Sequence, residues 1–272
     1  MMKNPMEYGK AKGIVLVQKY LPQINPFKRI DIISTMDEWN DVKDKYGEFV
    51  ASRVDMPIGE AKKNAVKGTS GLPESIPSLI EKVNEQSSNG VVLVMETKKQ
   101  AVPRYEYDGG FNISFNTGEN IIIEIVGKSF DGHELTQGLA VHERYQIPWD
   151  AVLFMRDRRD LLKSRAVTKF CVTPENYAKQ RKERVKFLRD VCHYDIDKIE
   201  ENVPKQYQLV DNNIIKSILD DVILELMKKQ DMLRQDGLRR FGIQGNLIEG
   251  RVEPWEIFRA ERWLSKDVDM ER

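Results

Sequence analysis

The sequence has little of what defines several classes of protein. Its 272 residues include 2 cysteines and 3 histidines. The cysteines, Cys171 and Cys192, lack CxxC spacing, which disfavours a disulfide framework and favours a reducing compartment. No apolar run approaches the roughly 18 residues of a transmembrane helix, and the N-terminal residues contain no signal-peptide hydrophobic region. These absences predict a cytoplasmic protein that has no membrane partner.

The sequence also lacks an excess of charge of either sign. Lysine and arginine number 43, aspartate and glutamate number 43, and the formal net charge is zero. This balance argues against a general nucleic-acid-binding protein, although a local basic patch stays open. Hydrophobic residues make up 40% of the chain, which is enough for a sizeable core in one large domain or two modest ones.

The first hundred residues alternate between strand and helix signals. Thr35 and Glu38 form a capping-box pattern that predicts a helix over 36–46. The all-apolar run Val91–Met95 predicts a strand buried on both faces. Short apolar runs predict strands at 14–20, 30–33 and 49–53, and an apolar stripe predicts a helix at 76–87.

The clearest hairpin lies at 110–126. Phe111 to Phe115 and Ile121 to Ile125 alternate with polar residues around a TGEN turn, so one face is apolar and the other carries asparagine, serine and Glu124. A carboxylate on a central strand must be exposed on a solvated face, hydrogen-bonded, ion-paired or bound to metal, because burying it alone is costly.

Two loops hold further candidate residues. The segment 59–74 combines glycines with lysines and resembles phosphate-cradling loops, although it matches no P-loop or dinucleotide motif and is also typical of a mobile surface loop. The segment 127–138 contains Lys128, Asp131 and His133. A histidine metal site here fits no zinc spacing, whereas Mg²⁺ needs only one or two carboxylates with phosphate oxygens.

The composition changes after residue 155. Residues 156–190 are strongly basic and include a helix that begins at Thr173 and Pro174. An acidic loop is predicted at 195–204, a long helix with an apolar stripe at 213–235, a flexible glycine-containing connection at 237–250, and a last helix from Pro254. We therefore predict an α+β fold: a mixed β-sheet with packed helices in domain 1–155, and a mainly helical region at 156–272 that packs on it.

Residues 48–145 resemble ATP-grasp nucleotide-binding proteins. The resemblance is carried by Arg53-Val-Asp55 at a strand end, the lysine and glycine loop 59–71, strand 91–95 ending in Glu96 and Lys98, and the paired strands with Glu124. The family usually has two magnesium-binding acidic residues near the end of the fold, often with an asparagine two positions after a glutamate. Here that pattern occurs only at Glu200-Glu201-Asn202, which departs from the family arrangement.

The resemblance implies ATP and Mg²⁺ as cofactors. It implies an ATP-dependent carboxylate–amine ligase that acts through an acyl phosphate, or a degenerate relative that binds nucleotide without turning it over; it names no catalytic residue. Glu124 and Asp131 would hold Mg²⁺, Lys98 or Lys99 would contact phosphate, and Glu96 would lie near the base or ribose. The nucleotide-binding set is Arg53, Lys62, Lys63, Glu96, Lys98, Lys99 and Lys128.

Two alternatives remain. The basic segment 156–190, with Phe170, Tyr177 and Phe187, could bind nucleic acid, in which case binding would weaken steeply with salt. The other alternative is a non-enzymatic assembly protein, in which the apolar helix 213–235 forms a homo-oligomer.

Overall fold

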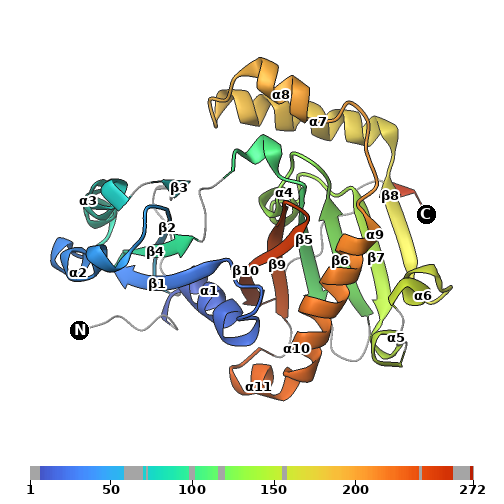
Figure 1. The fold of residues 1–272 in the computed structure, drawn as a ribbon, viewed down its shortest axis with the longest axis horizontal. Helices are drawn as coiled ribbons and strands as arrows, with labels where there is room; N and C mark the ends of the chain where they lie inside the picture. The colour runs from blue at the N-terminus through green and yellow to red at the C-terminus, as the bar shows by residue number, and fades with distance from the viewer. Residues whose placement is uncertain are drawn as a thin grey trace. The chain divides into compact units, whose positions relative to one another are not determined.

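The structure is a computed structural model that describes residues 7–57, 70–71, 73–97, 102–115, 120–154, 158–238, 241–259 and 270–271. The chain forms two compact units, Met1–Ala101 and Val102–Arg272. Each unit has its own antiparallel sheet (Figure 1), so the α+β prediction is confirmed. Our predicted boundary after residue 155 instead falls inside the second unit, because strands on either side of it pair in one sheet.

The first unit contains a four-stranded sheet in the order β1-β4-β2-β3. Its elements are α1 (Gly9–Tyr20), β1 (Phe27–Ile33), α2 (Met36–Val42), β2 (Val50–Asp55), β3 (Ser70–Gly71), α3 (Ile76–Gln86) and β4 (Val91–Thr97). The capping box is present, since the Thr35 side chain accepts from the Glu38 N–H and the Glu38 carboxylate accepts from the Thr35 N–H.

Strand β4 is buried on both faces, as its apolar run predicts. Val92 and Val94 pack in one core cluster with α2 and α3, whereas Leu93 and Met95 pack in another with α1. The strand predicted at 14–20 is wrong, because this segment is the second half of helix α1. Asp55 accepts hydrogen bonds from the N–H groups at the start of that helix, which fixes it against β2.

The second unit contains a seven-stranded sheet in the order β10-β9-β5-β6-β7-β8-β11. Its strands are β5 (Gly109–Phe115), β6 (Asn120–Val126), β7 (Glu143–Pro148), β8 (Thr168–Val172), β9 (Phe241–Ile248), β10 (Arg251–Arg259) and β11 (Met270–Glu271). Its helices are α4 (Gly132–Thr136), α5 (Trp149–Phe154), α6 (Arg158–Lys163), α7 (Pro174–Asp190), α8 (Ile196–Asn202), α9 (Asn212–Ser217), α10 (Leu224–Lys228) and α11 (Gln230–Gln235).

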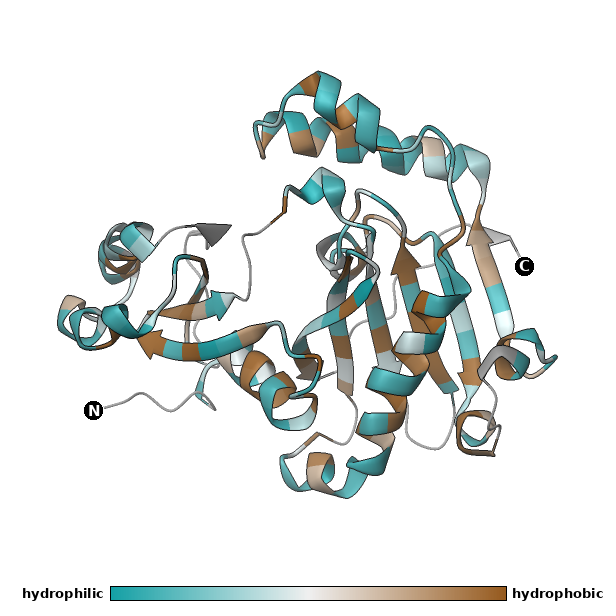
Figure 2. Cartoon of the chain, viewed as in Figure 1, coloured by the Kyte–Doolittle hydropathy of each residue, from teal (hydrophilic) through white to brown (hydrophobic). Residues whose placement is uncertain are grey.

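The predicted hairpin is confirmed: its two strands pair antiparallel, and the structure adds the register, with Phe111 opposite Ile125 and Phe115 opposite Ile121. The turn residues 116–119 lie outside the described part of the chain. The alternation along the strands appears as hydrophobic and hydrophilic bands in Figure 2. The long helix continues from α9 through a π-helical segment, Ile218–Ile223, into α10. Its buried stripe and the buried apolar face of the sheet together form the core of the unit.

Three predictions for the C-terminal part are wrong. The connection predicted at 237–250 contains strand β9, the helix predicted from Pro254 is strand β10, and the predicted acidic loop contains helix α8. β10 is the edge strand of its sheet, where a proline need not donate a hydrogen bond, so Pro254 is compatible with a strand.

Candidate functional site

The polar face of the second sheet carries a continuous row of five polar side chains. Asn112 lies opposite Glu124 on one neighbouring strand and opposite Gln244 on the other. Arg144 lies opposite Glu124, and Glu256 lies opposite Gln244. Because directly opposite residues share a face, these five residues cross the sheet from β10 to β7. We call them the polar row.

Four members of the polar row are buried. The exposed fractions are 2% for Asn112, 3% for Glu124, 5% for Gln244 and 8% for Glu256. The Gln244 side-chain amide donates to Glu256 Oε2 at 2.8 Å. Arg144 donates to Glu124 Oε1 from Nε at 3.0 Å and from Nη2 at 2.8 Å. Both carboxylates are therefore held in place by polar neighbours within the row.

Two oxygen atoms in the middle of the row have no such neighbour. Asn112 Oδ1 and Gln244 Oε1 are buried and accept no hydrogen bond within the described residues. A buried acceptor without a partner costs about 1–3 kcal/mol, so two on adjacent strands are a considerable local cost. Such atoms are a reason to expect a ligand that offers hydrogen-bond donors or a positive charge.

The oxygen-rich composition of the row fits a hard cation. Mg²⁺ and Ca²⁺ bind carboxylate and amide oxygens, and Mg²⁺ commonly takes only one or two carboxylates. Asn112 and Gln244 would supply amide oxygens between the carboxylates of Glu124 and Glu256. Among the described residues, no group of three or more histidine, cysteine, aspartate or glutamate residues could hold a metal, so a site made only of these residue types is not found there.

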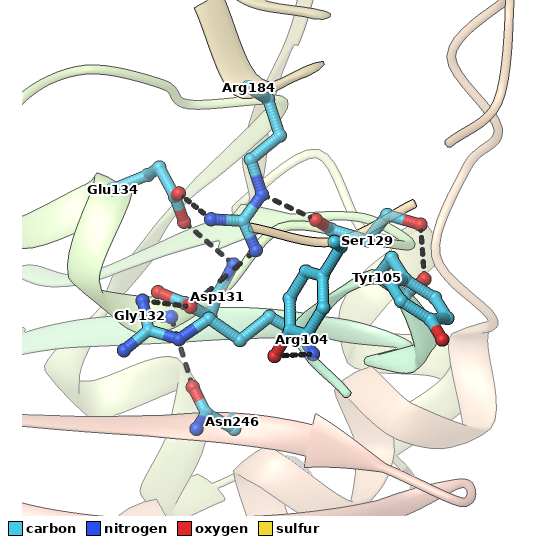
Figure 3. Close-up of polar contacts among 9 residues, drawn as sticks. Arg104, Tyr105, Ser129, Asp131, Gly132, Glu134, Arg184 and Asn246 are labelled. Atoms are coloured by element: carbon cyan, nitrogen blue, oxygen red, sulfur yellow. Dashed lines mark hydrogen bonds and ion pairs between the residues drawn. The ribbon is translucent and has the colours of Figure 1, made fainter. Parts of the chain in front are cut away.

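A second polar cluster is built around Arg184 of helix α7 (Figure 3). Arg184 Nε donates to the Ser129 carbonyl at 2.7 Å, and Nη1 forms an ion pair with Glu134. Arg184 Nη2 lies 3.6 Å from Asp131 Oδ2, and Arg104 Nη1 lies 3.4 Å from the same oxygen. The four charged side chains fasten α7 to α4 and to the segment around Arg104.

The cluster perturbs one carboxyl group strongly. Burial first, and the nearby Asp131 carboxylate second, raise the pKa of Glu134 to about 8 against the opposing effect of Arg184. Glu134 Oε2 also accepts from the Asp131 N–H at 2.8 Å. The raised pKa means that Glu134 can carry a proton near neutral pH.

A close backbone contact joins this cluster to the polar row. Gly110 lies on the same face as Asn112, and a Cβ there would approach Gly132 N to 2.2 Å and Asp131 C to 2.4 Å. The Gly132 N–H donates to Asn246 Oδ1 at 3.0 Å. The start of α4 therefore lies directly on the sheet, next to the row.

The predicted magnesium residues, Glu124 and Asp131, belong to these two neighbouring sites. Glu124 is buried, so of the alternatives for this strand residue the solvated one is wrong. Each carboxylate meets arginine: Glu124 pairs with Arg144, and Asp131 lies near Arg104 and Arg184. Both carboxylates already have an arginine neighbour, so a cation at Glu124 would have to compete with that arginine.

The two predicted nucleotide-binding residues that the structure describes in the first unit, Arg53 and Glu96, are not brought together. Arg53 lies opposite Leu93, on the sheet face of α1, whereas Glu96 lies opposite Val50, on the face of α2 and α3. Glu96 pairs with Lys28 at 3.5 Å. Two residues on opposite faces of one sheet cannot line one pocket on either face. Lys62, Lys63, Lys98 and Lys99 lie outside the described residues, and Lys128 is exposed in the second unit.

Arg144, Gln244 and Glu256 are absent from the predicted site. Gln244 and Glu256 do not stand out as site residues, because the sequence predicts a connection around Gln244 and a helix around Glu256 and so places neither residue on a strand. Alternating apolar residues in FGIQGNLI would have revealed the first strand. No local pattern reveals Arg144 as the partner of Glu124, since their pairing depends on sheet register.

Two arginines of the basic segment 156–190 bind other parts of the protein and so are not available to a nucleic acid. Arg184 is 2% exposed, and Arg181 donates to the Pro204 carbonyl at 3.0 Å and pairs with Glu200. Glu200 and Glu201 lie in helix α8, whereas the family pattern places such residues beside a strand. The charge of this segment therefore serves partly to fasten helices α7 and α8.

No helix in the described part of the chain is long and apolar enough to span a membrane. Neither a protein-family model nor a curated protein matches the chain. Among solved structures, ACD1 of Ca. Korarchaeum cryptofilum in complex with coenzyme A has a TM-score of 0.42 and 12% identity, covering 90% of this chain and 89% of that one. PH1788 from Pyrococcus horikoshii Ot3 has a TM-score of 0.37 and 13% identity, covering 91% and 97%. At these TM-scores neither likeness bears on function.

Proposed function

We propose that this protein binds ATP together with Mg²⁺ at the polar row, as an ATP-grasp-like nucleotide-binding protein. The observation that carries the proposal is the pair of buried, unpartnered amide oxygens, Asn112 Oδ1 and Gln244 Oε1, between two carboxylates. When bound, Mg²⁺ supplies positive charge that neutralises phosphate oxygens.

The residues of the row have distinct parts in this proposal. Glu256 and the two amide oxygens hold the cation, and the hydrogen bond from Gln244 keeps the Glu256 carboxylate in position. Arg144 provides a guanidinium that matches phosphate geometry. Ligation of a carboxylate to an amine is the reaction that the resemblance adds to nucleotide binding, and ADP release in the presence of candidate acids and amines tests it.

Thermal unfolding tests nucleotide binding. We expect ATP with Mg²⁺ to raise the melting temperature more than either alone, since a ligand at about 100 times its Kd adds about 2.7 kcal/mol to the stability. Glu256→Gln should remove the dependence of this shift on Mg²⁺, because the cation loses a carboxylate ligand. Glu201→Gln, an exposed glutamate on α8, is the matched control and should behave as the wild type. A wild type whose melting temperature ignores millimolar ATP and Mg²⁺ would contradict the proposal.

A further inference from the structure

Helix α7 carries a stripe of lysines on the side opposite its buried residues. Lys179, Lys182 and Lys186 are exposed, and spacings of three and four residues keep them within about 60° of one another around the helix axis. Tyr177 and Leu188, which are buried, project from roughly the opposite side of the helix. We call the three lysines the lysine stripe.

The charge of the lysine stripe is not neutralised by ion pairs. No carboxylate in the described part of the chain lies within ion-pair distance of the three lysines, although Glu175 and Glu183 are each four residues from Lys179. Other lysines of the second unit do form helical ion pairs: Lys198 with Glu201, Lys216 with Asp220, and Lys228 with Glu225. The stripe therefore presents three ammonium groups to the solvent.

The helix holds these lysines at fixed positions. Its other side is fastened to the body of the second unit, because Arg184 Nε donates to the Ser129 carbonyl at 2.7 Å. Leu188 packs in one cluster with Ile199 and Val203, at and just after helix α8, which lies along α7 (Figure 1). A partner can therefore bind the stripe without first ordering the helix, which lowers the entropic cost of binding.

The aromatic residues of α7 are not available for stacking on bases. Tyr177 is 3% exposed, and the Phe187 ring lies beneath the guanidinium groups of Arg104 and Arg184, at 5.7 and 5.5 Å. Proteins that bind single strands combine basic residues with exposed aromatic rings, whereas the backbone of a duplex is bound through lysine and arginine alone. The surface of α7 thus fits a duplex better than a single strand.

A membrane surface fits the stripe less well. Helices that lie on anionic membranes bury a set of large apolar side chains beside their basic residues. The helix Pro174–Asp190 is described throughout, and none of the large apolar residues exposed on the protein belongs to it. Its exposed side can therefore attract anionic lipid but offers nothing to insert.

We propose that the lysine stripe binds the phosphate backbone of a double-stranded nucleic acid without reading its sequence. Each lysine neutralises one phosphate and releases condensed counterions, and contacts to phosphate carry no sequence information. The chain has a formal net charge of zero, so the attraction is confined to the stripe and binding is weak at physiological salt. The proposal goes beyond nucleotide binding at the polar row and does not depend on it.

Fluorescence anisotropy with a labelled DNA duplex of mixed sequence, titrated at several salt concentrations, tests the stripe. The logarithm of the association constant should fall with the logarithm of the salt concentration with a slope of about −2.7, which is about −0.9 for each of three phosphates. Lys182→Gln should reduce the slope to about −1.8. Replacing all three lysines with glutamine should abolish binding at low salt.

A second triple variant controls for net charge. Replacing Lys198, Lys216 and Lys228 with glutamine removes the same charge from ion-paired positions, and this variant should bind the duplex as the wild type does. Glutamine has nearly the helix propensity of lysine, so both variants should keep the circular dichroism spectrum of the wild type. A duplex of a different sequence and an RNA duplex should bind with similar affinity.

Three results would overturn the proposal. The wild type does not bind the duplex at low salt, or the control variant loses as much affinity as the stripe variant. Alternatively, the wild type prefers a single strand of the same length, or vesicles that contain phosphatidylserine, over the duplex. The thermal shift with ATP and Mg²⁺ should be the same in the stripe variant as in the wild type, so nucleotide binding stands or falls separately.

Discussion

His142 shows how completely the fold can determine the chemistry of one residue. Its Nδ1 accepts a hydrogen bond from the Gly127 N–H at 2.9 Å, so a neutral imidazole carries its proton on Nε2. The rings of Phe130, Tyr177 and Tyr207 surround it, with centroids 4.5, 5.0 and 5.1 Å away. Burial lowers the pKa of His142 to about 3, against a smaller opposite effect of Gln180.

The lowered pKa predicts a loss of stability in acid. Between the ordinary value of 6.5 and about 3, the unfolded chain binds a proton at this residue that the folded chain does not. The contribution of His142 is therefore complete above pH 6.5 and falls as the pH falls, by up to about 1.4 kcal/mol per pH unit. Urea unfolding across this range should give a shallower pH dependence for His142→Asn, which retains an acceptor for Gly127.

The exposed His193 provides the control for this prediction. His193→Asn, which changes an exposed side chain, should unfold as the wild type does across this pH range. An unchanged slope in His142→Asn would show that His142 is not the origin of the acid sensitivity.

At the scale of elements, helix α7 is held by the buried side chain of Arg184 as well as by apolar packing. The helix begins with a Thr173 cap and is basic along its exposed surface, where Lys179, Lys182 and Lys186 lie. Arg184 instead reaches Glu134, Asp131 and the Ser129 carbonyl. The sequence marks the helix well, but its composition does not distinguish this arginine from the others.

Arg184→Met should destabilise the second unit in a pH-dependent way. Breaking a buried ion pair typically costs about 3–5 kcal/mol, because the remaining charge is uncompensated. We expect a smaller loss at pH 6, where Glu134 carries its own proton, than at pH 9, because Arg184 lowers the pKa of Glu134 and the loss therefore grows as the pH rises past about 8. Guanidinium unfolding at the two pH values measures the difference.

Two further variants control this experiment. Adding Glu134→Gln to Arg184→Met should recover part of the loss at high pH, because it removes the uncompensated charge. Arg189→Met, at an exposed position on the same helix, should unfold as the wild type does. Equal losses from Arg184→Met at both pH values would contradict the charge argument.

At the scale of the whole molecule, the chain divides into two compact units, each of which has its own sheet and its own clusters of buried residues. The core clusters around β4 lie within residues 1–101, whereas those around α7 and α8 lie within 102–272. Both strands that flank β5 in the sheet also belong to the second unit. Its architecture therefore needs no strand from the first unit.

We expect the fragment 102–272 to fold alone and to unfold cooperatively in urea, as followed by circular dichroism. The fragment 156–272, cut at the boundary that composition suggested, should not fold, because β8 and β9 lose their partners β7 and β5. An unstructured 102–272 fragment would show that the second unit depends on the first.

The sequence alone determined the elements whose signals are local. Period-two alternation placed the hairpin of β5 and β6, a capping box placed α2, and an all-apolar run placed β4 on the inside of a sheet. These succeed because a hydrogen-bonding cap or an alternating face acts within a few residues. Local signals gave wrong predictions where tertiary context overrode them. Pro254 lies on an edge strand and not in a helix, and the apolar run 14–20 lies in helix α1 and not in a strand.

Only the tertiary structure decided which residues meet. Sheet register put Arg144 opposite Glu124 and Gln244 opposite Asn112, and strand parity put Arg53 and Glu96 on opposite faces. These relations join positions far apart in the chain, and a shift of one residue would reverse every face. The sequence thus supplied the polar residues of a site, whereas the pairing of strands decided which of them form one.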